Sequence, residues 1–139
     1  MKGQIRIISE ILLFMVGIVI TSFVIFTFTN IASISEERAL NDQLTGVADT
    51  ISSAILKVTS NKNTSLTIEI PAKLSGKQYA IILDESLIIT DGRIEIVREL
   101  FNITKSYNII TSDGGRITSS AQYLTIRSDD KNNIIISRY

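Results

Sequence analysis

The hydrophobic pattern changes near residue 35. No charged residue occurs from Ile11 to Ser35, and Ile, Val, Leu and Phe dominate the part from Ile11 to Thr29. As a helix, an uncharged run of this length covers about 30 Å, which is enough to cross the hydrocarbon core of a bilayer. A cleavable secretory signal has a shorter apolar region, followed by a small-x-small site. Here the exit reads "FTFTNIASIS", with Ile34 where a small residue is needed, so we expect the run to be retained.

The next segment, "SEERALNDQLTGVADTISSAILKVTS", keeps a helical period but is apolar along one side only. Its apolar residues recur at spacings of three and four: Leu40, Leu44, Val47, Ile51, Ala54 or Ile55, and Val58. This spacing is typical of an amphipathic helix. No Pro or Gly separates the apolar run from this stripe, and Gly46 is its only weak helix former. We therefore predict one long helix, from about residue 5 to about residue 59.

After the polar stretch "TSNKNTS", the period changes to the alternation typical of strands. Seven or eight short strands are predicted, namely "SLTIEI", "QYAIIL", "SLIIT", "RIEIV", "SYNIIT", "RITSS", "QYLTIRS" and "NIIISRY". Asp91-Gly92 and "SDGGR" are read as hairpin turns. So small a sheet needs an apolar partner, which the stripe from Leu40 to Val58 provides. The predicted fold is α+β, with a long N-terminal helix packed on a small antiparallel β-sheet or sandwich.

These patterns predict four parts: a cytoplasmic leader and edge at 1–10, a transmembrane or assembly helix at 11–35, an amphipathic continuation at 36–59 and an extracellular β-rich domain at 60–139. The orientation follows from the flanking charges. Lys2 and Arg6 precede the uncharged run, whereas Glu36 and Glu37 follow it. The positive-inside rule then places the N-terminus in the cytoplasm and the β-rich domain outside a single-pass membrane protein.

The amino-acid composition excludes several kinds of binding and catalytic site. The 14 basic and 14 acidic residues cancel, so no global charge favours binding to nucleic acid. The chain contains no Cys and no His, which excludes disulfides, thiolate metal sites, imidazole ligands and a Ser-His-Asp triad. We expect no cofactor, no metal and no nucleic-acid partner.

The acidic residues that come closest to a catalytic or metal-binding pattern all lie in predicted turns: Asp84, Glu85, Asp91, Asp113, Asp129 and Asp130. Asp is favoured in turns because it bonds to the local backbone, and none of these residues forms a calcium-loop pattern. "SDDK", from Ser128 to Lys131, is a lone S-x-x-K in a turn, without S-D-N or K-T-G. We expect no enzymatic activity.

Other polar residues are spread along the predicted exterior. Two sequons, at Asn63 and Asn102, fall in predicted loops and are either glycan acceptors or chance matches to a short motif. Five arginines are expected on solvated edges and outward faces of strands, namely Arg93, Arg98, Arg116, Arg127 and Arg138. Glu10 directly precedes the apolar run, and is either an interfacial partner of Arg6 or a charge that meets a partner in an assembly.

The N-terminus resembles the class III signal peptide of type IV pilin-like proteins, particularly archaeal ones. The residues concerned are Lys2-Gly3-Gln4, Ser9-Glu10 and the uninterrupted apolar helix. The resemblance implies that a prepilin peptidase cuts between Gly3 and Gln4 and leaves the apolar stretch on the mature protein. It also implies that Glu10 acts in assembly. Bacterial members usually place this glutamate at the fifth mature position, whereas Glu10 would be the seventh, so an uncut N-terminus is the alternative. The stretch "IEIPAKLSGKQYAIIL" is similar, more loosely, to archaeal pilin-like exported proteins.

Two functions are therefore expected from the sequence. The first is a non-catalytic pilin-like subunit of an archaeal cell-surface filament or pilus-related machine. Its partners would be membrane lipid, other pilin-like subunits, prepilin peptidase and the pilus assembly machinery. The second is a permanently anchored exterior β domain that binds an envelope or secretion-system partner.

Overall fold

The computed structural model describes residues 2–61, 63–100, 103 and 105–139, with side chains from Ile7 onward within these ranges. One helix, α1, runs Lys2–Ser60, as the uninterrupted helical pattern predicted. The chain divides into two compact units, Met1–Arg38 and Ala39–Tyr139, and α1 contributes residues to both.

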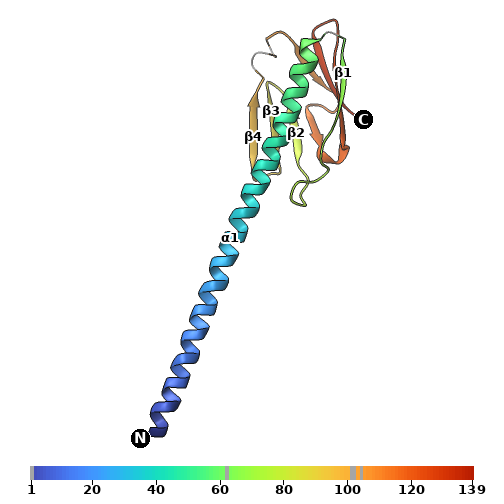
Figure 1. Ribbon diagram of the computed structural model, residues 1–139. Helices are drawn as coiled ribbons and strands as arrows, with labels where there is room; N and C mark the ends of the chain where they lie inside the picture. Colours follow the sequence, from blue (N-terminus) through green and yellow to red (C-terminus); the bar gives the residue numbers. More distant parts are fainter. Residues whose placement is uncertain (1, 62, 101–102, 104) are drawn as a thin grey trace. The chain divides into compact units, whose positions relative to one another are not determined.

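Strands make up most of the second unit. In the described part of the chain they are β1 (Ser65–Glu69), β2 (Ala80–Leu83), β3 (Ser86–Thr90), β4 (Glu95–Glu99), β5 (Asn108–Thr111), β6 (Arg116–Thr118), β7 (Tyr123–Ser128) and β8 (Asn133–Arg138), with a short 3-10 helix, η1 (Ser119–Ala121), after β6. They form two four-stranded sheets, ordered β1-β7-β8-β5 and β4-β3-β2-β6 (Figure 1). Every strand lies within a segment whose alternation predicted it or overlaps one. The α+β fold is therefore confirmed.

Neighbouring strands are antiparallel except for one pair. β5 pairs with β8 in parallel, from Asn108 opposite Asn133 to Thr111 opposite Ile136. A parallel pair needs a crossover connection, which the intervening β6 and β7 segments provide here. Local alternation predicts strands but carries no information about this direction.

The two predicted hairpin turns have different outcomes. β3 and β4 do form a hairpin at Asp91-Gly92, because Thr90 lies opposite Glu95. The "SDGGR" turn is not a hairpin, since β5 and β6 belong to different sheets. Gly114 and Gly115 have φ values of 67° and 92°, which favour glycine, and this turn carries the chain from one sheet to the other.

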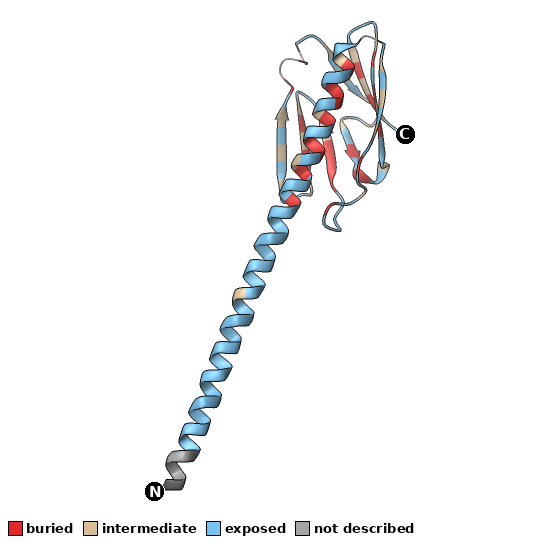
Figure 2. Cartoon of the chain, in the orientation of Figure 1, coloured by how far each residue is buried: buried red, intermediate tan, exposed pale blue. Residues whose placement is uncertain are grey.

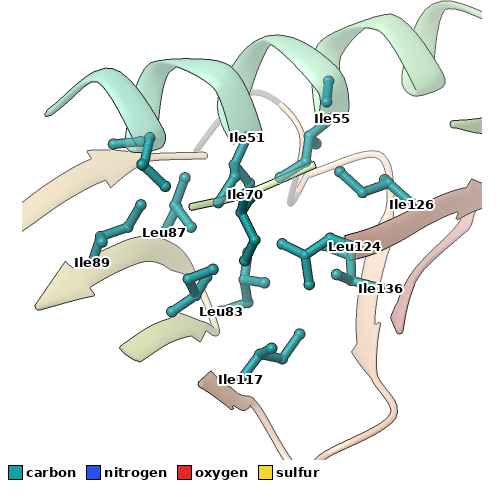
Figure 3. Packing of buried hydrophobic residues seen from close by; sticks show 14 of the residues in the cluster. Ile51, Ile55, Ile70, Leu83, Leu87, Ile89, Ile117, Leu124, Ile126 and Ile136 are labelled. Atoms are coloured by element: carbon teal, nitrogen blue, oxygen red, sulfur yellow. The ribbon is translucent and has the colours of Figure 1, made fainter. Parts of the chain in front are cut away.

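The core of the second unit lies between the two sheets and the amphipathic part of α1 (Figure 2). The predicted stripe is its helical side, and Leu44, Ile51 and Ile55 are completely buried. In Figure 3, isoleucine and leucine side chains from both sheets converge on Ile51 and Ile55. Each such side chain contributes about 1.5–3 kcal/mol on burial, so this packing is the main stabilising term.

Two hydroxyl groups, a buried one on Ser128 and a half-buried one on Tyr107, form hydrogen bonds with the backbone at the end of α1. Ser128, at the end of β7, donates its hydroxyl to the Asn61 carbonyl at 3.1 Å and accepts from the Thr64 N–H at 3.3 Å. The Tyr107 hydroxyl donates to the Thr59 carbonyl at 3.0 Å. These bonds satisfy carbonyl groups that the end of a helix leaves without intrahelical donors. Ser128, part of the S-x-x-K match, thus has a structural role.

Candidate membrane and assembly helix

The first unit exposes apolar side chains on all sides. Between Ile7 and Ile34, where every side chain is described, eighteen large apolar side chains are exposed, with exposed fractions from 43% at Val24 to 78% at Leu13 (Figure 2). We call the uncharged part of it, Ile11–Ser35, the apolar segment. Such a surface needs a cover other than water.

The helix is long and apolar enough to cross a membrane. Its most apolar window of 18 residues has a mean hydropathy of 2.7, and none of that window is buried. Length and composition alone support this assignment, and a signal sequence near an N-terminus has the same properties. The buried core helix of a water-soluble protein differs, because its apolar residues would be covered.

Polar side chains in the apolar segment mostly bond to the helix itself. The hydroxyl of Thr21 donates to the Gly17 carbonyl at 2.8 Å, and that of Thr27 donates to the Phe23 carbonyl at 2.8 Å. The hydroxyls of Thr29 and Ser33 bond to carbonyls three or four residues earlier in the same way. These bonds reduce the cost of placing the hydroxyls in an apolar environment.

The sequence-predicted processing and assembly residues all lie on this helix. Gly3 and Gln4 are helical, and the side chain of Gln4 is not among those described. Glu10 is helical and exposed, directly before the apolar segment. The cut between Gly3 and Gln4 and the assembly role of Glu10 stay predictions.

Of the two sequons, only the one at Asn63 begins within the described residues. Asn63 is exposed in the turn between α1 and β1, with a φ of 57°. Its side-chain amide donates to an Asp130 carboxylate oxygen at 2.7 Å, so this sequon is tied to the turn between β7 and β8. Asn102 lies outside the described residues. Glycosylation at either residue stays a prediction.

Of the acidic residues that were weighed as ligands, Asp91 stabilises a turn and Asp113 belongs to an ion pair. One Asp91 oxygen accepts the N–H groups of Ile94 at 2.8 Å and Arg93 at 3.0 Å, and these bonds, led by that of Ile94, hold its pKa below the usual value. An Asp113 oxygen lies 2.6 Å from Nε of Arg138. Among the described residues, no group of three or more Asp and Glu side chains is placed to hold a metal ion.

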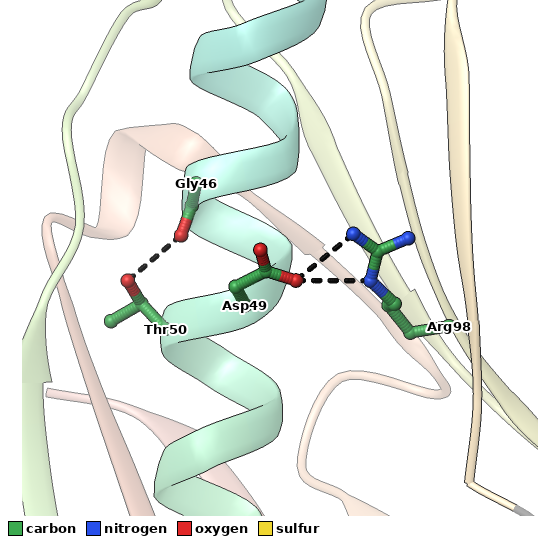
Figure 4. Close-up of polar contacts among 4 residues, drawn as sticks. All are labelled: Gly46, Asp49, Thr50 and Arg98. Atoms are coloured by element: carbon green, nitrogen blue, oxygen red, sulfur yellow. Dashed lines mark hydrogen bonds and ion pairs between the residues drawn. The ribbon is translucent and has the colours of Figure 1, made fainter.

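Sequence reasoning missed the ion pairs of the arginines. Arg98 is partly exposed on strand β4, in line with the expected solvated face, and Nε and a terminal nitrogen of its guanidinium also both lie 3.0 Å from one oxygen of Asp49 on α1 (Figure 4). Arg138 pairs with Asp113 in the same unexpected way. No local signal identifies these pairs, because their members are far apart in the sequence.

The surface of the described part of the second unit includes a larger and a smaller depression. The larger one, of about 780 Å³, is open and is lined by Asp84, Glu85, Ser86, Glu99, Lys105, Tyr107, Asn108 and Ile109. The smaller one, of about 350 Å³, lies between α1 and the chain that follows β1. We call it the Gly46 groove, and its lining is Gln43, Gly46, Val47, Thr50, Glu69, Ile70, Pro71 and Leu74.

Comparisons of this chain with protein-family models, curated proteins and solved structures found no match.

Proposed function

We propose that this chain is a pilin-like, non-catalytic subunit of an archaeal cell-surface filament or pilus-related machine, which assembles through its apolar N-terminal helix. The observation that carries the proposal is the apolar segment, which is helical, uncharged and exposed on all sides. A helix that is apolar all round fits either lipid or the interior of a helix bundle. A subunit that is stored in the membrane and then assembled needs a helix that fits both.

The free energy gained by covering the apolar side chains is large enough to support this function. Burying one large apolar side chain is worth about 1.5–3 kcal/mol, so covering the eighteen exposed between Ile7 and Ile34 is worth on the order of tens of kcal/mol. Lipid and neighbouring copies offer similar gains, because both are apolar. Transfer between them is then close to balanced, and a machine can drive it.

The second unit has the properties expected of the exterior part. It buries its own core, including the stripe on α1, and so does not depend on the apolar segment for an apolar cover. Lys2 and Arg6 before the segment, with Glu36 and Glu37 after it, favour an orientation with this unit outside. The resemblance of Lys2-Gly3-Gln4 to a class III signal peptide is the remaining support.

A second function uses the same helix as a permanent anchor. An uncharged run from Ile11 to Ser35 is sufficient to hold a domain at the membrane. The position of Glu10, two residues later than in bacterial pilins when counted from Gln4, favours this alternative. The exterior unit would then bind an envelope or secretion-system partner, without cleavage and without filaments.

Intact-mass measurement on protein from native membranes and surface filaments tests the proposal. The expected mature chain begins at Gln4 and is found in filaments. A chain that retains Met1 and occurs only in membranes would contradict the pilin function and favour the anchored domain.

A matched pair of variants tests the mechanism. Glu10→Ala should insert into the membrane normally but form no filaments, because assembly requires this carboxylate. Glu36→Ala removes a carboxylate at the other end of the uncharged run and should still assemble. Filaments at parental levels in Glu10→Ala would count against the assembly role.

A further inference from the structure

Nothing in the part of the chain that the structure describes requires a glycine at residue 46. It is exposed and helical, and a Cβ added to it would meet no heavy atom within 4 Å. Its backbone does not have a positive φ, so the position does not require glycine for conformational reasons. Glycine in a helix is destabilising relative to alanine. The space beside Gly46 is therefore open, and another molecule can approach the backbone of α1 closely there.

The side chains around Gly46 form a mostly apolar groove. Val47, Ile70 and Leu74 are buried at the floor of the Gly46 groove, and Pro71 adds an apolar wall. The Thr50 hydroxyl donates to the Gly46 carbonyl at 2.8 Å, so it is already used within the helix (Figure 4). Of the residues that line the groove, only Glu69 is charged. An apolar side chain therefore fits this groove better than a charged one does.

The chain itself supplies an exposed apolar helix that can act as the partner. The apolar segment exposes rows of Ile, Leu, Val and Phe side chains, and it has no charge to desolvate. Side-chain ridges of one helix pack into the grooves of another, and glycine lets two backbones approach closely. We propose that the Gly46 groove receives the apolar segment of a second copy of this chain. This proposal rests on the proposed function, since the segment must first leave the lipid.

The contact has a consequence for the kind of assembly. The groove lies at residues 43–74, whereas the apolar segment lies at residues 11–35, so the two partners use different surfaces. Such a heterologous contact generates rings where the rotation between copies closes and open filaments where it does not. The groove thus links each subunit to the next in one direction.

Filling the groove tests the proposal. Gly46→Leu places a side chain in the open space, and Asn41→Leu adds a similar side chain at an exposed helical residue that does not line the groove. Full-length Gly46→Leu should melt at a temperature no lower than the parent's, because leucine is the better helix former and a Cβ at this residue meets no heavy atom within 4 Å. It should nevertheless lose at least tenfold in filament yield, whereas Asn41→Leu should keep the parental yield. Parental filament yield in a folded Gly46→Leu variant would overturn the proposal.

A photocrosslinking side chain at Gln43 identifies the occupant. In filaments of the full chain, mass spectrometry should find it joined to a peptide from residues 11–35 of another copy. Capture of a different peptide, or of lipid alone, would overturn the proposal even if filaments form. If the parental chain forms no filaments and retains Met1, the proposed function fails instead, so the two failures are distinguishable.

Discussion

The two halves of α1 share one secondary structure but are stabilised differently. Between Ile7 and Ile34 the helix is apolar on every side and exposed, whereas from Leu40 to Val58 it buries one stripe against two sheets. Most helical stability in proteins comes from packing of an apolar face, not from helix propensity. The second half has this packing within its own chain. The first half exposes its apolar side chains, and in the proposed function lipid or other copies cover them.

The largest expected effect comes from removing the same side chain in each half. Ile55 is completely buried and Ile25 is 59% exposed. In detergent micelles, Ile55→Ala should lower the free energy of unfolding of the second unit by about 2–5 kcal/mol, because it leaves a cavity in the core. Ile25→Ala should change it by less than about 0.5 kcal/mol. Chemical denaturation followed by near-ultraviolet circular dichroism measures both.

The two substitutions remove identical atoms, so each serves as the control for the other. If Ile25→Ala destabilised the second unit as much as Ile55→Ala does, the two halves would share one cooperative core. The comparison would then be wrong.

The part of the fold that could be predicted follows from the spacing of apolar residues along the chain. The helix from about residue 5 to about residue 59 and the strand segments follow from spacings of three to four and of two. The strand order and the parallel pairing of β5 with β8 do not, because each depends on contacts between distant segments. The "SDGGR" turn shows the same limit, since its glycines signal a turn but not which sheet follows it.

The candidate sites were predictable to different degrees. The apolar segment follows from composition alone, and its exposure agrees with that reading. The Gly46 groove was not foreseen, because Pro71 and Leu74 reach α1 only through the fold. In the sequence, Gly46 was merely a weak point in a helix.

A second prediction is that alkaline pH destabilises the second unit but leaves the apolar segment unchanged. Tyr79 is 3% exposed, its hydroxyl donates to the Pro71 carbonyl at 2.7 Å, and burial raises its pKa from 10.0 to about 12. The folded state therefore holds this proton more tightly, so its stabilising effect is complete below pH 10 and is lost as pH rises from about 10 to about 12. The loss should reach about 2–3 kcal/mol for the second unit. The apolar segment has no titratable side chain, and its helicity in micelles should stay constant.

Denaturant midpoints between pH 9 and pH 12 measure this effect, with Tyr79→Phe as the control. At neutral pH the free energy of unfolding of the phenylalanine variant should be about 1 kcal/mol lower than the parent's, because the hydrogen bond is lost. Between pH 10 and pH 12 it should fall by less than the parent's does, because the variant has no hydroxyl at this residue to titrate. An identical alkaline dependence in parent and variant would mean that another group controls the unfolding.

The smallest expected effect concerns the ion pair between Asp49 and Arg98, on the outward side of the amphipathic half. The side chains are 59% and 39% exposed, so solvent screens their attraction. A double-mutant cycle with Asp49→Asn and Arg98→Gln should give a coupling energy of about 0.2–1 kcal/mol, despite the short distances. That coupling should nearly vanish at 1 M salt, where the screening length is about 3 Å. A coupling above about 2 kcal/mol would mean that charge, and not only buried apolar area, holds this half of α1 to the sheets. Burial alone would then no longer explain why this half packs within its own chain and the apolar half does not.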